Sequence, residues 1–193
     1  MQTLICSVHI KKLSELSRQE NIDLWFEDEC HFQQHGSRYS MWIPPEIKDP
    51  VLYHAPTRKI QGVFGAVQAH KGRLVTQFED TFNANTFQSF LEYVLRYRTA
   101  GKKMVLVLDN ARWHHAKVLK PWLFKHRDEI QLDFLPPYSP ELNTIERVWK
   151  LTRRLCTHNR YFQYVSNLTQ AISQQFIAWV KPNETLRKLC AVN

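Results

Sequence analysis

The stretch at residues 104–108 reads Met-Val-Leu-Val-Leu and runs directly into Asp109 and Asn110. Five apolar residues in a row leave no polar face, which is typical of a strand that is covered on both sides of a sheet. Such strands occur where helices pack on both faces of a sheet that is at least partly parallel. The segment therefore predicts an α/β fold with residues 104–108 at its centre and Asp109 at the carboxyl end of that strand.

The patterns around this strand complete the expected fold. Further strands are predicted at residues 22–26, 38–43, 59–68, 74–78 and 130–135. Helices are predicted before residue 17, from residue 85 towards Gly101, near residues 118–123 with a late start or kink at Pro121, and at residues 143–157, 167–180 and 183–190. The early strands form an antiparallel meander, so we expect a mixed central sheet flanked by helices.

Composition and charge limit the function. The 193 residues are 44% hydrophobic and hold 26 Lys and Arg against 18 Asp and Glu, as in a folded globular domain. Residues 1–95 carry a net charge of −2 and residues 96–193 a net charge of +10. A basic half favours a polyanionic partner, most simply nucleic acid, while a merely solubilising surface is the alternative.

No apolar run reaches the ~20 residues of a membrane span, and the first thirty residues contain no signal-peptide core. The four cysteines lie 24, 126 and 34 positions apart, which fits neither a CxxC pair nor a disulfide scaffold. We therefore expect reduced thiols and a cytoplasmic location.

Three carboxylates stand out. Asp28 and Asp109 each follow a predicted strand, and the carboxyl ends of strands are where open α/β sheets place their sites. On a helical wheel, Glu146 lies on a polar face, together with Lys150, Arg153 and Arg154. The opposite face is predicted to be buried and holds Ile145, Val148, Trp149, Thr152, Leu155 and Cys156.

Each carboxylate also has a structural interpretation. Asn143 followed three residues later by Glu146 is the pattern of a capping box, which needs no chemistry. Asp-Asn after a strand is a common turn, and Glu27-Asp28-Glu29 is commonly a solvated acidic edge. Residue by residue, these alternatives stay open.

Taken together, three segments resemble the signature blocks of DDE transposases. They are Leu-Trp-Phe-Glu-Asp-Glu-Cys-His-Phe around Asp28, Val-Leu-Asp-Asn-Ala-Arg-Trp-His around Asp109, and residues 135–149, which contain Tyr-Ser-Pro-Glu-Leu-Asn-Thr-Ile-Glu-Arg-Val-Trp. The match is closest to the insertion-sequence 630 and mariner group, in which a similar spacing occurs: here 36 residues separate Asp109 from Glu146. Thr144 stands where proline is frequent in that group.

The resemblance implies a ribonuclease H-like fold in which Asp28, Asp109 and Glu146 hold two Mg²⁺ or Mn²⁺ ions. Hard divalent cations prefer carboxylate oxygen, and two such ions can assist in-line displacement at phosphorus. It further implies cleavage of DNA at element ends followed by strand transfer into target DNA. Asn110 and His114 match the second block and would orient a ligand or touch the scissile strand, while turn and helix-start roles are the alternative.

Lys150, Arg153 and Arg154 would contact DNA phosphates, with ordinary solvated charge as the alternative. Glu27 and Glu29 are expected to support Asp28 from behind or to lie at the surface. We expect residues 1–21 to be a lead-in segment, residues 22–160 the catalytic domain, and residues 161–193 helices that pack on the same domain.

The expected partners are terminal-repeat and target DNA, a second copy of the chain in the active complex, and a helix-turn-helix protein encoded upstream, in a bacterial, nucleoid-associated setting. Only about twenty residues precede the first predicted strand, too few for a helix-turn-helix module. Two rival functions remain: a non-catalytic, DNA-associating remnant of an element, and a ribonuclease H-like nuclease without strand transfer.

Overall fold

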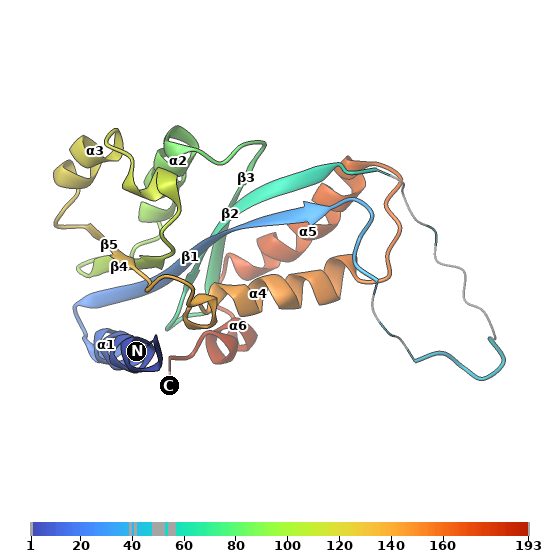
Figure 1. The fold of residues 1–193 in the computed structure, drawn as a ribbon, viewed down its shortest axis with the longest axis horizontal. Coiled ribbons are helices and arrows are strands. Elements are labelled where there is room, and N and C mark those ends of the chain that lie inside the picture. The colour runs from blue at the N-terminus through green and yellow to red at the C-terminus, as the bar shows by residue number, and fades with distance from the viewer. Residues whose placement is uncertain (1, 39, 41, 48–52, 54–56, 193) are drawn as a thin grey trace.

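A five-stranded mixed sheet with helices on both faces forms the centre of the molecule (Figure 1). The computed structural model describes residues 2–38, 40, 42–47, 53 and 57–192, with side chains from Ser7 onward. The strands lie in the order β3-β2-β1-β4-β5. Their bounds are β1 Ile22–Gln33, β2 Ile60–Gln68, β3 Arg73–Glu79, β4 Lys103–Leu108 and β5 Ile130–Phe134.

The sheet changes direction at its centre. β1, β2 and β3 form an antiparallel meander, whereas β4 is parallel to β1 and β5 is parallel to β4. Residues 104–108 lie in β4, and Met104, Leu106, Val107 and Leu108 have no exposed surface, as the continuous apolar run predicts. The mixed sheet flanked by helices is thus confirmed.

Two predictions about the first strands are wrong. β1 does not stop at the acidic run but continues to Gln33, because residues 27–33 keep pairing with β2. No strand forms at the described residues of the expected 38–43 segment, and Tyr39 and Met41 lie outside the description. The meander therefore consists of β1, β2 and β3, and β1 pairs directly with β2 without an intervening strand at the described residues of the 38–43 segment.

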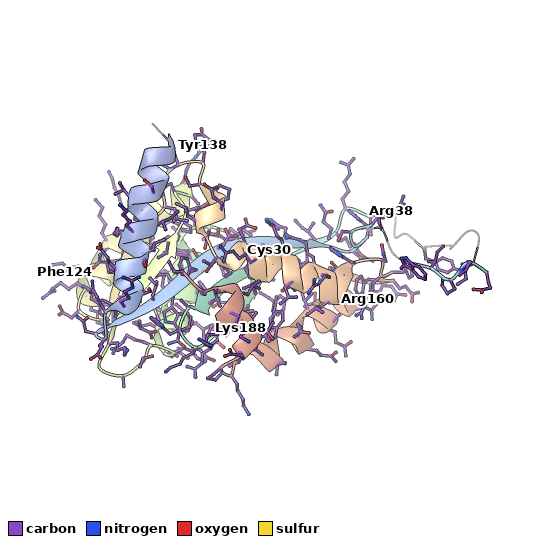
Figure 2. The ribbon with its side chains drawn as sticks, turned by 90° about the horizontal axis from the view of Figure 1, so that it is seen from below. Cys30, Arg38, Phe124, Tyr138, Arg160 and Lys188 are labelled. Carbon is purple, nitrogen blue, oxygen red and sulfur yellow. The ribbon has the colours of Figure 1, made fainter. Side chains whose placement is uncertain are left out.

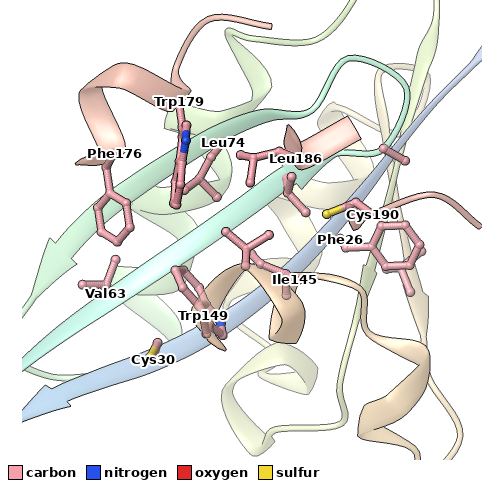
Figure 3. Close-up of a cluster of buried hydrophobic side chains, with 14 of the residues drawn as sticks. Phe26, Cys30, Val63, Leu74, Ile145, Trp149, Phe176, Trp179, Leu186 and Cys190 are labelled. Atoms are coloured by element: carbon pink, nitrogen blue, oxygen red, sulfur yellow. The ribbon is translucent and has the colours of Figure 1, made fainter. Parts of the chain in front are cut away.

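The helices divide between the two faces of the sheet. α1 Gln2–Arg18, α4 Ile145–Thr152, α5 Val165–Trp179 and α6 Glu184–Leu189 add side chains to one apolar cluster. α2 Ala84–Leu95, the 3-10 helix η1 Arg112–His115 and α3 Leu119–Lys125 pack into a second cluster on the other face. In Figure 3, Ile145 and Trp149 of α4 lie against the strands beside Phe176 and Trp179 of α5.

Local signals set several helix ends correctly. Asn83 caps α2, with its side chain accepting hydrogen bonds from Asn85 and Thr86. α3 begins only at Leu119, two residues before Pro121, so the helix does start late. The predicted helix at residues 143–157 is instead a 3-10 turn Pro140–Leu142, then α4, then a π-helix Arg153–Thr157.

The π-helix explains one misplaced side chain. Leu155 was predicted on the buried face, but it is 43% exposed. A π-turn advances fewer degrees per residue than an α-helix, so the wheel at 100° per residue loses its phase after Thr152. Cys156 is still buried.

Three thiols, Cys30, Cys156 and Cys190, are buried and form no disulfide in the described part of the chain. The side chain of Cys6 lies outside that part. Within the described ranges, every helix is too short or too polar to traverse a bilayer.

Candidate active site

Asp28, Asp109 and Glu146 line one pocket of about 400 Å³. The strands explain why two of them meet. β1 and β4 run in parallel with Phe26 opposite Val107, so Asp28 and Asp109 both lie two residues beyond the last paired position. Since side chains alternate between faces, both continue the side of the sheet to which Phe26, Val107 and α4 belong.

Asp28 lies within β1, not at its end, and its carboxylate sits over the α4 side. The indole Nε1–H of Trp149 donates a hydrogen bond to Asp28 Oδ2 at 3.0 Å. Burial, followed by the negative charges of Glu146 and Glu29, raises the pKa of Asp28 to about 8. Asp28 and Glu146 therefore lie close enough to repel one another.

Asp109 follows β4 directly and is more exposed. Its Oδ1 accepts a hydrogen bond from the backbone N–H of Ala111 at 2.8 Å and lies 3.2 Å from Nδ1 of His114. The hydrogen bond with His114 is the main reason that the pKa of Asp109 is lowered. This carboxylate is held charged at the rim of the pocket.

Glu146 occupies the first turn of α4 and is half-buried. The capping box that would explain it structurally is not formed. The α4 N-cap is Thr144 without a side-chain hydrogen bond, and Asn143 donates its amide to the backbone oxygen of Glu27 at 2.7 Å. Glu146 thus lines the pocket without having to cap the helix.

A second cluster lies behind the pocket, on the α2 side of the sheet. His114 is buried, with Nε2 at 3.1 Å from Glu29 Oε1 and 3.8 Å from Glu27 Oε2. Trp113 also donates to Glu29 Oε1 at 2.7 Å. Burial opposes a charged imidazole, but the hydrogen bonds to Asp109 and Glu29 and the charges of Glu27 and Glu29 raise the pKa of His114 to about 10.

Glu27 of this cluster lies in an environment that the sequence did not indicate. It has no exposed surface, and within the described part neither carboxylate oxygen has a hydrogen-bond partner. Burial, then the charge of Glu29, raises the pKa of Glu27 well above its usual range. A surface position is therefore wrong for Glu27. The carboxylate of half-buried Glu29 contacts Trp113 and His114, and its support of Asp28 stays a prediction.

The two supporting residues have different places. Asn110 lines the pocket and donates to the backbone oxygen of Leu135 at 2.6 Å, which ties the end of β4 to the end of β5. His114 contacts Asp109 from behind and is only 2% exposed, so orienting a ligand fits it and touching a DNA strand does not. At the rim, Tyr138 is 90% exposed with φ of 57°, a left-handed backbone that tyrosine rarely adopts.

The predicted cationic face of α4 is only partly free. Lys150 and Arg154 are exposed, but half-buried Arg153 donates to Sγ of Cys30 and lies over the Phe32 ring. A groove of about 710 Å³ runs beside them, lined by Arg147, Lys150, Leu151, Arg153, Arg154, His158 and Leu189. We refer to these residues as the α4 groove. Arg147 and His158 also line this groove, although no sequence pattern pointed to them.

Comparison with known proteins decides the family. Residues 23–169 match the model of the DDE superfamily endonuclease family, which is more than half of the chain. The chain belongs to this family. The resemblance seen in the three sequence blocks is thereby confirmed.

This chain has relatives in bacteria and nematodes. It is 40% identical over 104 residues to protein y4pE/y4sA of Sinorhizobium fredii, covering 52% of this chain and 71% of that one. It is 28% identical to the Tcb2 transposase of Caenorhabditis briggsae, covering 83% of this chain and 63% of that one. It is 24% identical to the 39 kDa protein of insertion element IS630 of Shigella sonnei, covering 92% of this chain and 50% of that one.

Solved structures of Mos1 transposase share the fold. A paired-end complex with the left transposon end has a TM-score of 0.68 at 18% identity, covering 96% of this chain and 56% of that one. A paired-end complex with Mn has a TM-score of 0.70 at 16% identity, with the same coverage. One with Mg has a TM-score of 0.62. The ribonuclease H-like fold is thus confirmed, and this chain spans little more than half of these transposases.

Proposed function

We propose that this chain is the catalytic domain of a DDE transposase that cleaves DNA strands at the ends of an element and transfers them into target DNA. The observation that carries the proposal is the meeting of Asp28, Asp109 and Glu146 in one pocket, from β1, the end of β4 and the first turn of α4. Membership of the DDE endonuclease family supports it. We assign residues 22–160 to this domain, with residues 1–21 leading in and 161–193 packing on it.

The residues of the pocket fit a pair of divalent cations. All three side chains are carboxylates, the donors that Mg²⁺ and Mn²⁺ prefer. In the described part of the chain, neither Asp28 nor Glu146 forms an ion pair, so their mutual repulsion is balanced by no protein cation. We therefore assign Asp28, Asp109 and Glu146 as the ligands. When bound, two Mg²⁺ or Mn²⁺ ions would activate the attacking oxygen and stabilise the leaving oxygen.

The protein's own groups prepare this site. Trp149 fixes the direction of the Asp28 carboxylate, and His114 with the Ala111 N–H fixes that of Asp109. Asn110 links the carboxyl ends of β4 and β5, which keeps the residues that line the pocket in place. No side chain has to act as a nucleophile, since the oxygen of a water molecule or of a 3′-hydroxyl forms the new bond to phosphorus while the bond from phosphorus to the leaving 3′-oxygen breaks.

DNA is the proposed substrate, bound as element ends and as target, with Lys150 and Arg154 on phosphates and Arg153 beside them in the α4 groove. Mos1 complexes that contain transposon ends support this choice. We further propose that the active complex is a homodimer in the bacterial cytoplasm, close to the nucleoid. A helix-turn-helix module supplied from outside residues 1–193 would read the terminal repeats.

The test uses terminal-repeat duplexes from the DNA that flanks the gene, with and without an upstream-encoded helix-turn-helix protein. We expect nicking with Mg²⁺ or Mn²⁺ and none with a chelator, followed by joining of the cut strand to a plasmid. Nicking without joining would favour the nuclease alternative. DNA binding without nicking in either setting would favour the non-catalytic remnant.

A further inference from the structure

A second cationic surface lies away from the α4 groove and takes no part in the site described above. It consists of the exposed residues Arg112, Lys117, Lys120, Lys125 and Arg127, which we call the α3 surface. Residues 110–127, which contain all five, include no Asp or Glu. The segment therefore presents five positive charges from η1, α3 and their flanks.

These cations are not paired with acidic side chains. None of the five cations forms an ion pair within the part of the chain that the structure describes. Glu129, a half-buried acid two residues after Arg127, is already engaged by Arg98 at 3.2 Å and His126 at 2.7 Å. Asp128 is the one exposed acid that follows directly, and it offsets one of the five charges. Cations left unpaired at a surface are free to take phosphate oxygens.

The α3 surface also includes a depression and an exposed aromatic ring. A depression of about 410 Å³ between α3 and the edge strand β5 is lined by Lys103, Lys120 and Arg127 together with His115 and Phe134. Beside it, Phe124 is 70% exposed, and the Arg127 guanidinium lies 4.6 Å from its ring centroid. Figure 2 shows Phe124 at the edge of the molecule. The ammonium and guanidinium groups around this depression are suitable donors to phosphate oxygens.

The position of this surface links it to the pocket. η1 begins three residues after Asp109, and His115 Nε2 lies 3.3 Å from Oδ1 of Asn110, which lines the pocket. α3 packs on the α2 face of the sheet, whereas α4 packs on the opposite face (Figure 1). The α3 surface and the α4 groove therefore extend from the carboxylate pocket along opposite sides of the sheet.

We propose that the α3 surface binds the sugar-phosphate backbone of double-stranded DNA, along a stretch different from the one held in the α4 groove. The inference rests on the proposed function, because strand transfer requires two DNA backbones to meet at one set of carboxylates. Contacts of this kind are independent of sequence and strongly dependent on salt. The α3 surface thus places a second DNA segment against the pocket from the side of β5.

The test compares two variants of equal net charge in the full chain. One carries Lys120→Gln, Lys125→Gln and Arg127→Gln. The control carries Lys11→Gln, Lys71→Gln and Lys181→Gln, which are exposed and belong neither to the α3 surface nor to the α4 groove. Affinity for duplex DNA is measured by fluorescence anisotropy over a series of salt concentrations. We expect the α3 variant to lose about tenfold or more in affinity and about two to three units of log–log salt slope, and the control to change little.

Duplex length and a conservative variant sharpen the result. As the duplex is shortened, the α3 variant should be the first to bind as tightly as the wild type, because a short duplex no longer reaches the α3 surface. Lys150→Gln with Arg154→Gln should still weaken binding at that length. Lys120→Arg, Lys125→Arg and Arg127→Lys should keep wild-type binding. Equal losses in the α3 variant and the control, or no loss in either, would overturn the inference. Metal-dependent nicking by the wild type would still support the proposed function in that case. Tighter binding of RNA than of DNA at this surface would also overturn the inference.

Discussion

Trp149 donates its indole Nε1–H to Oδ2 of Asp28 at 3.0 Å, joining α4 to β1 across 121 positions of the chain. The ring itself is 1% exposed and packs in the core, so one residue both anchors the helix and directs the carboxylate. Groups that orient a metal ligand typically change metal affinity 10–100-fold when they are removed.

Trp149→Phe tests this relationship. The change keeps an aromatic ring in the core but removes the hydrogen bond to Asp28. We expect Mn²⁺ affinity, measured by calorimetric titration, to fall by about tenfold or more. Phe176→Leu is the matched control, because it disturbs the same cluster without touching a carboxylate. Equal losses of affinity in both variants would show that core packing, and not the hydrogen bond, positions Asp28.

Glu146→Gln separates chemistry from helix capping. Because the capping box is not formed, we expect the melting temperature to change little, while Mg²⁺-dependent nicking becomes nearly undetectable. Asp109→Asn should behave alike, and the double variant should lose little more, since residues that act as a unit are not additive. Exposed Glu20→Gln is the control. Retained nicking in Glu146→Gln would remove Glu146 from the site.

Asp28 predicts a pH dependence of the stability of the metal-free protein. Its pKa is raised to about 8 by burial and by Glu146 and Glu29, against about 3.9 in an unfolded chain. Between these values the folded state binds more protons than the unfolded state, so stability falls as pH rises. Asp28→Asn should therefore melt higher than wild type at pH 8 without metal and show a flatter pH profile. Thermal unfolding from pH 5 to pH 8 measures both.

His114→Leu should be strongly destabilising at neutral pH. It removes the imidazole that pairs with buried Glu27 in the described part of the chain, and loss of one partner of a buried ion pair typically costs roughly 3–5 kcal/mol. Because the pKa of His114 is raised to about 10, the stabilising charge is fully present below pH 6.5 and is lost as pH rises through 10. Adding Glu27→Leu should recover part of the loss in denaturant unfolding. If it recovers none, the two groups are not coupled.

Gly65 faces Trp149 so closely that a side chain has no room. A Cβ on Gly65 would lie 2.3 Å from Cη2 of the indole. Gly65→Ala should therefore destabilise the protein by about 1–3 kcal/mol and displace the ring from Asp28. Combining it with Trp149→Phe should cost less than the sum of the two single changes, as measured by urea unfolding. Strict additivity would contradict the close contact.

The sequence by itself determined the central strand, the capped helix α2 and the candidate carboxylates, because each depends on a pattern within a few neighbouring residues. The apolar run at residues 104–108 has few ways to be buried except as a strand covered on both faces. Asn83 caps α2 through N–H groups two and three residues away. The DDE blocks are also local.

Only the tertiary structure decided how far β1 runs, that Glu27 is buried, and which groups hold the carboxylates. The acidic run at residues 27–29 looks like an exposed edge, but pairing with β2 carries the strand through it. Asn143 matches a capping pattern, yet the backbone oxygen of Glu27, 116 positions away, takes its side chain. Trp149 and His114 reach Asp28 and Glu29 across 121 and 85 positions. Local periodicity cannot predict such partners, because they depend on how distant segments pack.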